Sequence, residues 1–518
     1  MTWTRRDFMV TSALAAGAVS LVGCASSKKE EVAVPLQQEP FVQPILADCR
    51  GYFEAKFGVT TETIDRVLRE ALSSGGHWGE LFFEHTFSLA LVLRDGIVST
   101  ASTGTGLGMG VRTVVDDQVG YAYTESLLPE DMLRAAQASA AIAQGADVGV
   151  LMARKWLDFK RFYTDSADFA NLDVAILVAF LRDIEARTRA KDPLVTKVEA
   201  SVSFVERRIM VNTSDGVTAE DVQPYLMLRL SVVMEKDGET QTNSTSVAGM
   251  AGFDFFTRER VEMAIDEVVR NTRLLFDAVK PRGGEWPVIL AAGASGILLH
   301  EAIGHGIEAD FNRKNISIFA DKLNKRVAED EVTIVDDATI EMNRGALNVD
   351  DEGIVGQRTV LVEKGVLRSY LHDKISARHY GVDPTGNGRR ESYKHSPQPR
   401  MRTTYMENGS SSLEEMLHGI QYGLYCERFT NGQVLIGPGD YTFYVKNGFL
   451  IEDGKLTAPI KDVNLIGNGP DTLAKMVKVG ADLEISTWGG TCGKGGQGVP
   501  VGLGMPSVLV SSLTVGGI

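Results

Sequence analysis

The sequence predicts an α+β fold, with a mixed helix and antiparallel-sheet domain first and a β-rich domain second. Helical and strand-like periodicities are mixed up to about residue 283, whereas strand and turn patterns dominate after it. Residues 48–518 are also too many for one hydrophobic core, so at least two domains are expected. We place the boundary at the turn-forming residues PRGG, which gives domains at 48–283 and 284–518.

The first domain is expected to contain helices and long hairpins. Helical periodicity predicts helices at residues 61–74, 129–144, 172–190 and 258–279. Alternating patterns predict strands at 81–93 and 96–101, a hairpin across 116–117, and two long strands around 214–216. The hairpin turns contain Asp and Gly, which tolerate the left-handed backbone that tight turns need.

The second domain is expected to be mainly strand and turn. Strand patterns cover residues 359–371 and 441–460, and the latter contains two expected turns, at Asn447-Gly448 and Asp453-Gly454. Short helices are expected at 320–324, 376–380, 413–419 and 472–477, besides the helix that starts near His300.

The N-terminus predicts export and anchoring. Residues 4–9 (TRRDFM), with Arg5 and Arg6, resemble a twin-arginine export signal, and the apolar stretch that follows ends in a lipobox at Cys24. We therefore expect a signal peptide at 1–23, a lipidated Cys24, and a proline-containing tether at 24–47. The alternative, a transmembrane helix, is disfavoured because about 13 apolar residues cannot span a bilayer core of about 30 Å. We therefore expect the protein to be a lipoprotein that is anchored to a membrane and faces the periplasm.

Charge and cysteine content limit the partners and cross-links. The net charge of −15, without a basic cluster, argues against a nucleic-acid partner. Cys49 and Cys426 could form a disulfide in an oxidising compartment, although two unpaired thiols are the favoured alternative.

The segment HEAIGHGIEAD at 300–310 is the main candidate for a functional site. Its two imidazoles and its carboxylates have the composition of a metal site, but the spacing is H-E-x-x-x-H. On a regular α-helix, residues five apart point about 140° away from each other. His300 and His305 can share a metal only if a π-type turn brings them together or if the helix ends near Gly304.

A zinc site needs a third protein ligand, and Cys492 in the glycine-rich stretch TWGGTCGKGGQGVPVG is the best candidate. Glu301, next to His300, is the candidate general base. The alternative for the segment at 300–310 is a buried histidine pair that binds no metal. A phosphate-binding loop is excluded for the glycine-rich stretch, because Trp488 and Gly495 stand where such a loop requires Gly and Ser or Thr.

The H-E-x-x-x-H segment, GTCGKGGQGVPVG, VNLIGNGPDTLAKM and SSLTVGG together resemble the TldD/PmbA family of metallopeptidases. The resemblance extends from about residue 60 to the C-terminus. It implies one zinc per chain, bound by His300, His305 and Cys492, with Glu301 activating water. Because these four residues are present, the chain looks like the catalytic TldD type and not the PmbA (TldE) type, which lacks the motif.

Further residues are weaker candidates. Glu308 and Asp310 could orient His305 from outside the metal shell, although a solvated acid is an equal alternative for Glu308. His395, Arg400 and Tyr405 could stabilise an oxyanion. The alternative for each of them is a purely structural role. The resemblance favours Arg400 and Tyr405, because an RMxxTY/F pattern recurs among members of the family.

The resemblance implies a peptidase that cleaves unfolded or short peptides, held as an added strand inside a closed dimer cavity. The partner would be a second copy or a PmbA/TldE-type subunit. Two other functions use the same residues: a metal-dependent amidase of cell-envelope peptides, and a non-catalytic lipoprotein with a structural zinc.

Overall fold

The computed structural model describes residues 50–145, 148–164 and 167–517, which belong to one compact unit. The expected signal peptide with Arg5 and Arg6, the acylated Cys24, the tether and Cys49 lie outside the described residues. Within the described ranges, none of the helices combines the length and apolar character that a membrane crossing requires. The fold is α+β, as the sequence predicts.

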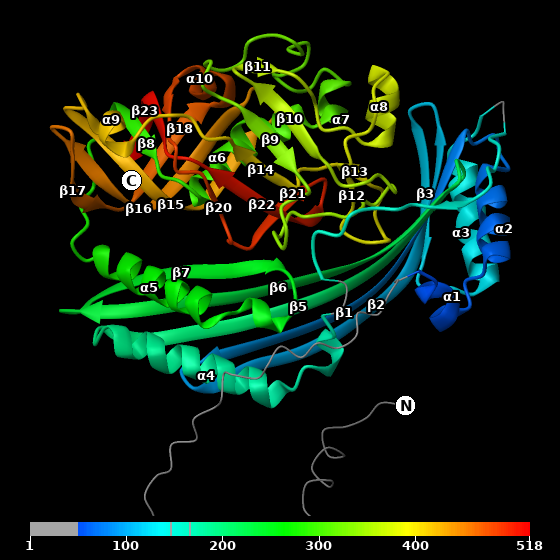
Figure 1. Cartoon of the computed structure of the whole chain (residues 1–518), viewed down its shortest axis with the longest axis horizontal. Helices are drawn as coiled ribbons and strands as arrows, with labels where there is room; N and C mark the ends of the chain where they lie inside the picture. The colour runs from blue at the N-terminus through cyan, green and yellow to red at the C-terminus, as the bar shows by residue number, and fades with distance from the viewer. Residues whose placement is uncertain (1–49, 146–147, 165–166, 518) are drawn as a thin grey trace, which may run out of the picture. The chain divides into compact units, whose positions relative to one another are not determined.

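The first sheet is formed by long antiparallel strands (Figure 1). Its members are β1 (Trp78–Arg94), β2 (Ile97–Val115), β3 (Gln118–Thr124), β4 (Lys155–Trp156), β5 (Val195–Thr213), β6 (Val217–Lys236) and β7 (Glu239–Met250). They pair in the order β3-β2-β1-β5-β6, and β4 and β7 both pair with β6. The predicted hairpins are confirmed, with left-handed backbone at Asp95 and Asp116. β2 extends well beyond the predicted end at residue 101.

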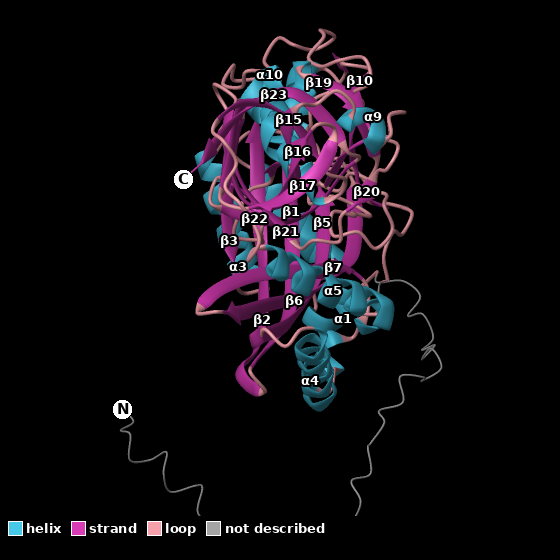
Figure 2. Cartoon of the chain, turned by 90° about the vertical axis from the view of Figure 1, so that its left-hand side faces the viewer, coloured by secondary structure: helices cyan, strands magenta, loops and turns pink. Residues whose placement is uncertain are grey.

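Five helices pack on this sheet, namely α1 (Tyr52–Phe57), α2 (Thr61–Leu72), α3 (Pro129–Ile142), α4 (Val174–Lys191) and α5 (Arg258–Leu274). The first three share a core with one end of β1 and β2, whereas α4 and α5 cover the long strands near the other end. Figures 1 and 2 show that α4 lies farther from the C-terminal strands than α5 does, and α5 contacts the second half of the chain through Arg270 and Asn271. All four predicted helices are present, and α5 ends five residues earlier than expected.

The remaining strands form two larger sheets and a small one. The second sheet contains β9 (Ile334–Asp337), β10 (Arg358–Glu363), β11 (Val366–Leu367), β14 (Thr403–Met406), β20 (Glu484–Ile485), β21 (Gly490–Lys494) and β22 (Gln497–Met505). The third contains β8 (Gly284–Leu290), β15 (Tyr422–Leu435), β16 (Asp440–Glu452), β17 (Lys455–Ile460), β18 (Val463–Asn468), β19 (Met476–Val479) and β23 (Val508–Gly517). A pairing between β15 and β16 closes the third sheet on itself, and β12 (Gly388–Arg389) pairs with β13 (Gln398–Pro399).

The helices of this half are short: α6 (Ile297–Leu299), α7 (Ala309–Asn312), α8 (Lys374–Tyr380), α9 (Leu413–Leu417) and α10 (Gly469–Ala474). The prediction of a helix at residues 320–324 is wrong. Turns stand there, because Asp321 and Asn324 adopt left-handed backbone that an α-helix excludes.

One of the two predicted turns in 441–460 is also wrong. Asp453-Gly454 turns as expected, but Asn447-Gly448 lies inside β16. The side chain of Asn447 is buried, accepts from Asn243 at 2.7 Å and donates to the Asn271 carbonyl at 2.9 Å. The pair therefore anchors the strand to the first sheet and to α5.

A buried ion network joins the two halves of the chain. Arg112 of β2 donates to Glu80 of β1 at 2.6 Å and to Glu352 of the second half at 2.5 Å. Arg390, also from the second half, pairs with Glu80, and all four side chains are fully buried. Burial raises the pKa of a carboxyl group, but the two guanidinium groups outweigh it and lower the pKa of Glu80.

We expect Arg112→Met to lower the free energy of unfolding by about 3–5 kcal/mol, because it leaves buried carboxylates without their counter-charge. Urea unfolding at pH 7 measures the change. Arg94→Met is the matched control: it removes a guanidinium whose ion pair with Glu199 is exposed, and should cost under about 1 kcal/mol. Equal losses in the two variants would show that the buried network does not hold the halves together.

Candidate metal centre

Strand β8 leads directly into the segment that carries both histidines. After a 3-10 turn (Ala294–Gly296) and the single turn α6, the backbone forms a π-helix over His300–Gly304, and a 3-10 turn follows at His305–Ile307. The His305 N–H donates to the His300 carbonyl, five residues back. The two rings therefore meet, with centroids 5.0 Å apart. Of the two solutions expected from the five-residue spacing, a π-type turn or a helix that ends near Gly304, the structure shows the π-type turn.

Glycine is required in this turn for close packing. The backbone of Gly304 is ordinary right-handed helix, with φ −53°. A Cβ atom at Gly304 would lie 2.0 Å from the sulfur of Met401, and one at Gly306 would lie 2.5 Å from Phe319. A side chain at either position would force Met401, Phe319 or the turn itself to move.

Cys492 reaches the histidines from strand β21. Its Sγ lies 3.4 Å from His305 Nε2, and one ligand atom from each of His300, His305 and Cys492 lies within 4.8 Å of the others. All three side chains are buried. Arg400 fixes the strand from behind, because its Nη2 donates to the Cys492 carbonyl at 2.6 Å.

The electrostatics of this cluster favour the thiolate form of Cys492. Burial opposes ionisation, but the charges and hydrogen bonds of His300 and His305 bring the pKa of Cys492 well below its usual value. A thiolate is the form of cysteine that binds metal ions.

Glu308 holds His305 from its other ring nitrogen, as the sequence analysis proposed. Its Oε2 lies 3.0 Å from His305 Nδ1 and 3.1 Å from Lys494 Nζ. Burial alone would raise the pKa of Glu308, but Lys494 and His305 lower it to about 2. Asp310 instead pairs with Lys494 at 2.8 Å.

Lys494 is a residue of this site that was not predicted from the sequence. Cys492 and Lys494 are two residues apart on β21, so they share one face of the strand, and both are buried. This spacing was the available signal. Lys494 Nζ also donates to the Pro399 carbonyl at 3.0 Å.

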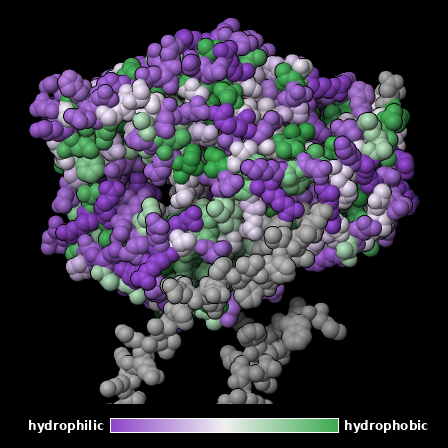
Figure 3. Space-filling model, in the orientation of Figure 1, coloured by the Kyte–Doolittle hydropathy of each residue, from purple (hydrophilic) through white to green (hydrophobic). Residues whose placement is uncertain are grey.

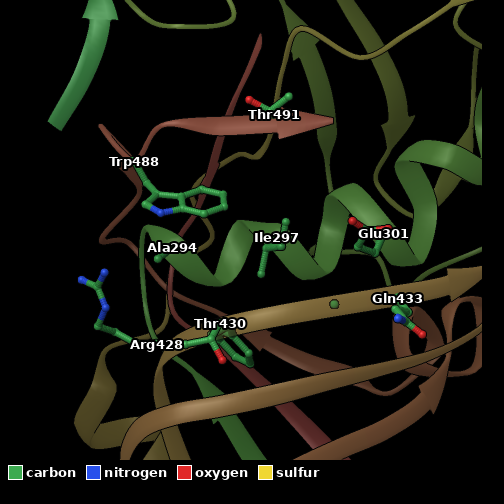
Figure 4. A pocket seen from close by; sticks show the side chains of 10 residues that line it. Ala294, Ile297, Glu301, Arg428, Thr430, Gln433, Trp488 and Thr491 are labelled. Carbon is green, nitrogen blue, oxygen red and sulfur yellow. The ribbon is translucent and has the colours of Figure 1, made fainter. Parts of the chain in front are cut away.

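Glu301 lies at the edge of an open pocket of about 390 Å³ (Figure 4). The pocket is lined by Ala294, Ile297, Glu301, Arg428, Phe429, Thr430, Gly432, Gln433, Trp488 and Thr491. Burial raises the pKa of Glu301, and the two histidines oppose the rise. Thr491 and Cys492 are neighbours on β21, so this strand contributes to the pocket and to the buried cluster.

The other candidates make different contacts. Arg400 binds the backbone carbonyls of Cys492 and Gln497. The hydroxyl of Tyr405 donates to Asp337 at 3.4 Å, and His395 Nδ1 lies 3.0 Å from Ser392 Oγ, so these two residues serve other parts of the second half. Cys426 is buried and forms no disulfide within the described residues, and Cys49, its possible partner, lies outside them.

We expect Lys494→Met to destabilise the protein by about 3 kcal/mol at pH 7, because Glu308 and Asp310 lose their buried cation. The folded-state pKa of Glu308, about 2, lies below its ordinary value of 4.5. The stabilisation is therefore present above pH 4.5 and is lost as the pH falls towards 2. The difference between wild type and variant should shrink over this range in urea unfolding, whereas exposed Lys455→Met should show little effect at any pH. A pH-independent difference would contradict the assignment.

Known proteins resemble this chain over most of its length. Family models described as PmbA/TldA metallopeptidase domain 1, central domain and C-terminal domain match residues 79–143, 167–276 and 283–517. The chain is 37% identical to a metalloprotease TldD homologue of Haemophilus influenzae, over 89% of this chain and 97% of that protein. It is 35% identical to a zinc metalloprotease TldD homologue of Saccharolobus solfataricus, over 46% of this chain and 53% of that protein.

Solved structures share the fold. TldE from Thermococcus kodakarensis matches with a TM-score of 0.70 and 19% identity, over 88% of this chain and all of that chain. A Thermotoga maritima protein described as a modulator of a DNA gyrase matches with a TM-score of 0.72 and 21% identity, over 88% of this chain and 99% of that chain. Together with the sequence matches, these likenesses show that the chain belongs to the TldD/PmbA family of metallopeptidases.

Proposed function

We propose that this metallopeptidase is a zinc-dependent enzyme in which His300, His305 and Cys492 hold one zinc ion and Glu301 is the general base. The observation that carries the proposal is the gathering of the three buried donor atoms within 4.8 Å, next to a pocket that Glu301 lines. Two imidazoles and a thiolate match the ligand preference of zinc. The name of the Saccharolobus solfataricus relative, a zinc metalloprotease, supports the same metal.

The residues present fit such an ion. The buried Nδ1 of His300 has no hydrogen-bond partner among the described residues, and such an atom is costly unless something satisfies it. The contact between Glu308 and His305 is the support that a metal-binding imidazole needs on its other nitrogen. Lys494 keeps Glu308 ionised, so the carboxylate remains an acceptor.

When bound, zinc would polarise the peptide carbonyl and lower the pKa of water. Glu301 would accept the proton of the attacking water and return it to the departing amine. Its raised pKa suits this exchange, because a base whose pKa is nearer to neutral also becomes a better acid. Glu308 would hold the His305 ring in one orientation throughout.

We propose unfolded or short peptides as the substrates. The pocket at Glu301, about 390 Å³, has room for a few residues of an extended chain and not for a folded domain. We also propose that the enzyme works as a dimer, with a second copy or with a TldE-type subunit. The likeness in fold to TldE is the support for a partner of this type.

Glu301→Gln should retain zinc and reduce peptide cleavage about 10²- to 10⁴-fold, because the variant keeps the three donors and loses the base. Cys492→Ser should instead lose most of the metal, since two protein ligands bind far more weakly than three. Elemental analysis and cleavage of an unfolded protein, with and without a chelator, measure both effects. Full cleavage by Glu301→Gln, or full zinc in Cys492→Ser, would contradict the assignment.

We further propose that the enzyme is exported by the twin-arginine route and anchored through an acylated Cys24. The support is the sequence: Arg5 and Arg6 precede a short apolar stretch that ends in a lipobox. An acyl chain attaches a protein to a membrane and takes no part in hydrolysis.

Replacing Arg5 and Arg6 together by lysine should keep the protein inside the cell with its signal uncut, because lysine lacks the planar donor fork of arginine. Cys24→Ala should abolish labelling with fatty acid, while the purified protein should still cleave peptides. Fractionation and metabolic labelling make the two measurements. Fatty-acid label in Cys24→Ala would place the acylation elsewhere.

A further inference from the structure

A second cavity opens next to the pocket at Glu301. It has a volume of about 300 Å³ and lies between β7 with α5 and the strands of the second half. Ala294, Arg428 and Trp488 line both cavities, and they stand at the end of the first pocket that is farther from Glu301 (Figure 4). In the space-filling view the molecule is hollowed in this region, with hydrophilic residues around the opening (Figure 3).

The walls of the second cavity carry a surplus of negative charge. Four carboxylates line it, from Glu267, Glu427, Asp482 and Glu484, against two guanidinium groups, from Arg270 and Arg428. Arg428 is already paired with Glu267. Arg270 lies 3.6 Å from Glu427, and the carboxylate of Asp482 accepts hydrogen bonds only from neutral groups of Ser507. Glu484 has no ion-pair partner in the part of the chain that the structure describes.

Two acceptor oxygens in this cavity also lack a donor. Asn271 is only 1% exposed, and its Oδ1 has no hydrogen-bond partner within the described residues. Glu427 Oε2 is likewise buried without a hydrogen bond, and its ion-pair partner Arg270 Nη2 lies 3.6 Å away, beyond hydrogen-bond distance. Buried acceptors without a donor, beside surplus carboxylates, suit a ligand that brings N–H groups and positive charge.

We propose that this acidic cavity, formed around Asn271, Glu427, Asp482 and Glu484, binds a cationic group of the peptide substrate. The ligand is an ammonium or guanidinium group, from a lysine or arginine side chain or from the free amino terminus. The inference rests on the proposed peptidase function and adds a preference for basic peptides. Asn271 Oδ1 and Glu427 Oε2 accept its hydrogen bonds, and Asp482 and Glu484 supply charge at the open side.

The helical segment that lines the first pocket, from Ala294 at the second cavity to Glu301, sets the position of the cationic group. Ala294 and Glu301 are seven residues apart along a largely helical segment, which corresponds to about 10 Å at about 1.5 Å per residue. An extended peptide covers this distance in about three residues. The basic residue should therefore lie two to four residues from the bond that is cleaved.

The test compares binding and cleavage of matched peptides. The probes are ten-residue Ala/Gly/Ser peptides with one lysine placed two to four residues to either side of the cleaved bond, and the same peptides with norleucine. In the zinc-loaded Glu301→Gln protein, fluorescence anisotropy should show about ten-fold tighter binding of a lysine peptide, as one charged hydrogen bond supplies. Acetylated and free amino termini distinguish the two sources of the ammonium group.

Glu484→Gln and Glu427→Gln, each added to Glu301→Gln, should reduce this preference for lysine by about ten-fold. Glu414→Gln, which removes an exposed carboxylate on α9, should keep it. In the enzyme with Glu301 intact, kcat/KM should show the same selective loss for lysine peptides.

The result that overturns the inference is equal binding of lysine and norleucine peptides, or an equal loss for both in Glu484→Gln and Glu427→Gln. Because binding is measured without cleavage, this result is separate from a failure of the proposed function. An inactive wild type that still prefers lysine peptides would refute the peptidase assignment and keep the acidic cavity. An active wild type without this preference would keep the peptidase assignment and refute the role of the acidic cavity.

Discussion

The π-turn between His300 and Gly304 is the constraint on which the candidate centre depends. A regular α-helix would leave the two imidazoles about 140° apart, and the wider turn removes most of that angle. Such turns are rare, so the surrounding core must hold this one in place. Met401 and Phe319 do so by contacting Gly304 and Gly306 where no side chain fits. The packing of the second half thus sets the geometry of the donors.

Buried charge is the second constraint, and it is met by long-range pairing. Glu308 supports His305 as an anion because Lys494 and His305 both offset the cost of burying its charge. The cation comes from β21, the strand that also carries Cys492. Arg400 binds the carbonyl of Cys492, so it holds the strand in place. The charges around the site are therefore balanced by the two segments that supply the metal donors.

Local chemistry made much of the fold predictable. Asp-Gly turns and helical periodicity located the hairpins and the helices of the first half, although strand β7 was not predicted. The same turn rule failed at Asn447-Gly448, because tertiary hydrogen bonds to Asn243 and Asn271 decide that conformation. For the site, the spacing in H-E-x-x-x-H predicted the distorted turn. The partnership of Glu308 with Lys494 joins residues 186 apart in the sequence, which no local pattern shows.

The donor cluster and the pocket are not independent features. His300 and Glu301 are adjacent on the π-turn, and Thr491 and Cys492 are adjacent on β21. In each pair one residue belongs to the buried cluster and the other lines the pocket. Because neighbouring side chains on a strand point to opposite faces, a one-residue slip of β21 against β22 would turn Cys492 away from His305 and also remove Thr491 from the pocket wall. The register of this hairpin, with Cys492 opposite Val499, therefore determines the candidate metal donors and the wall of the pocket together.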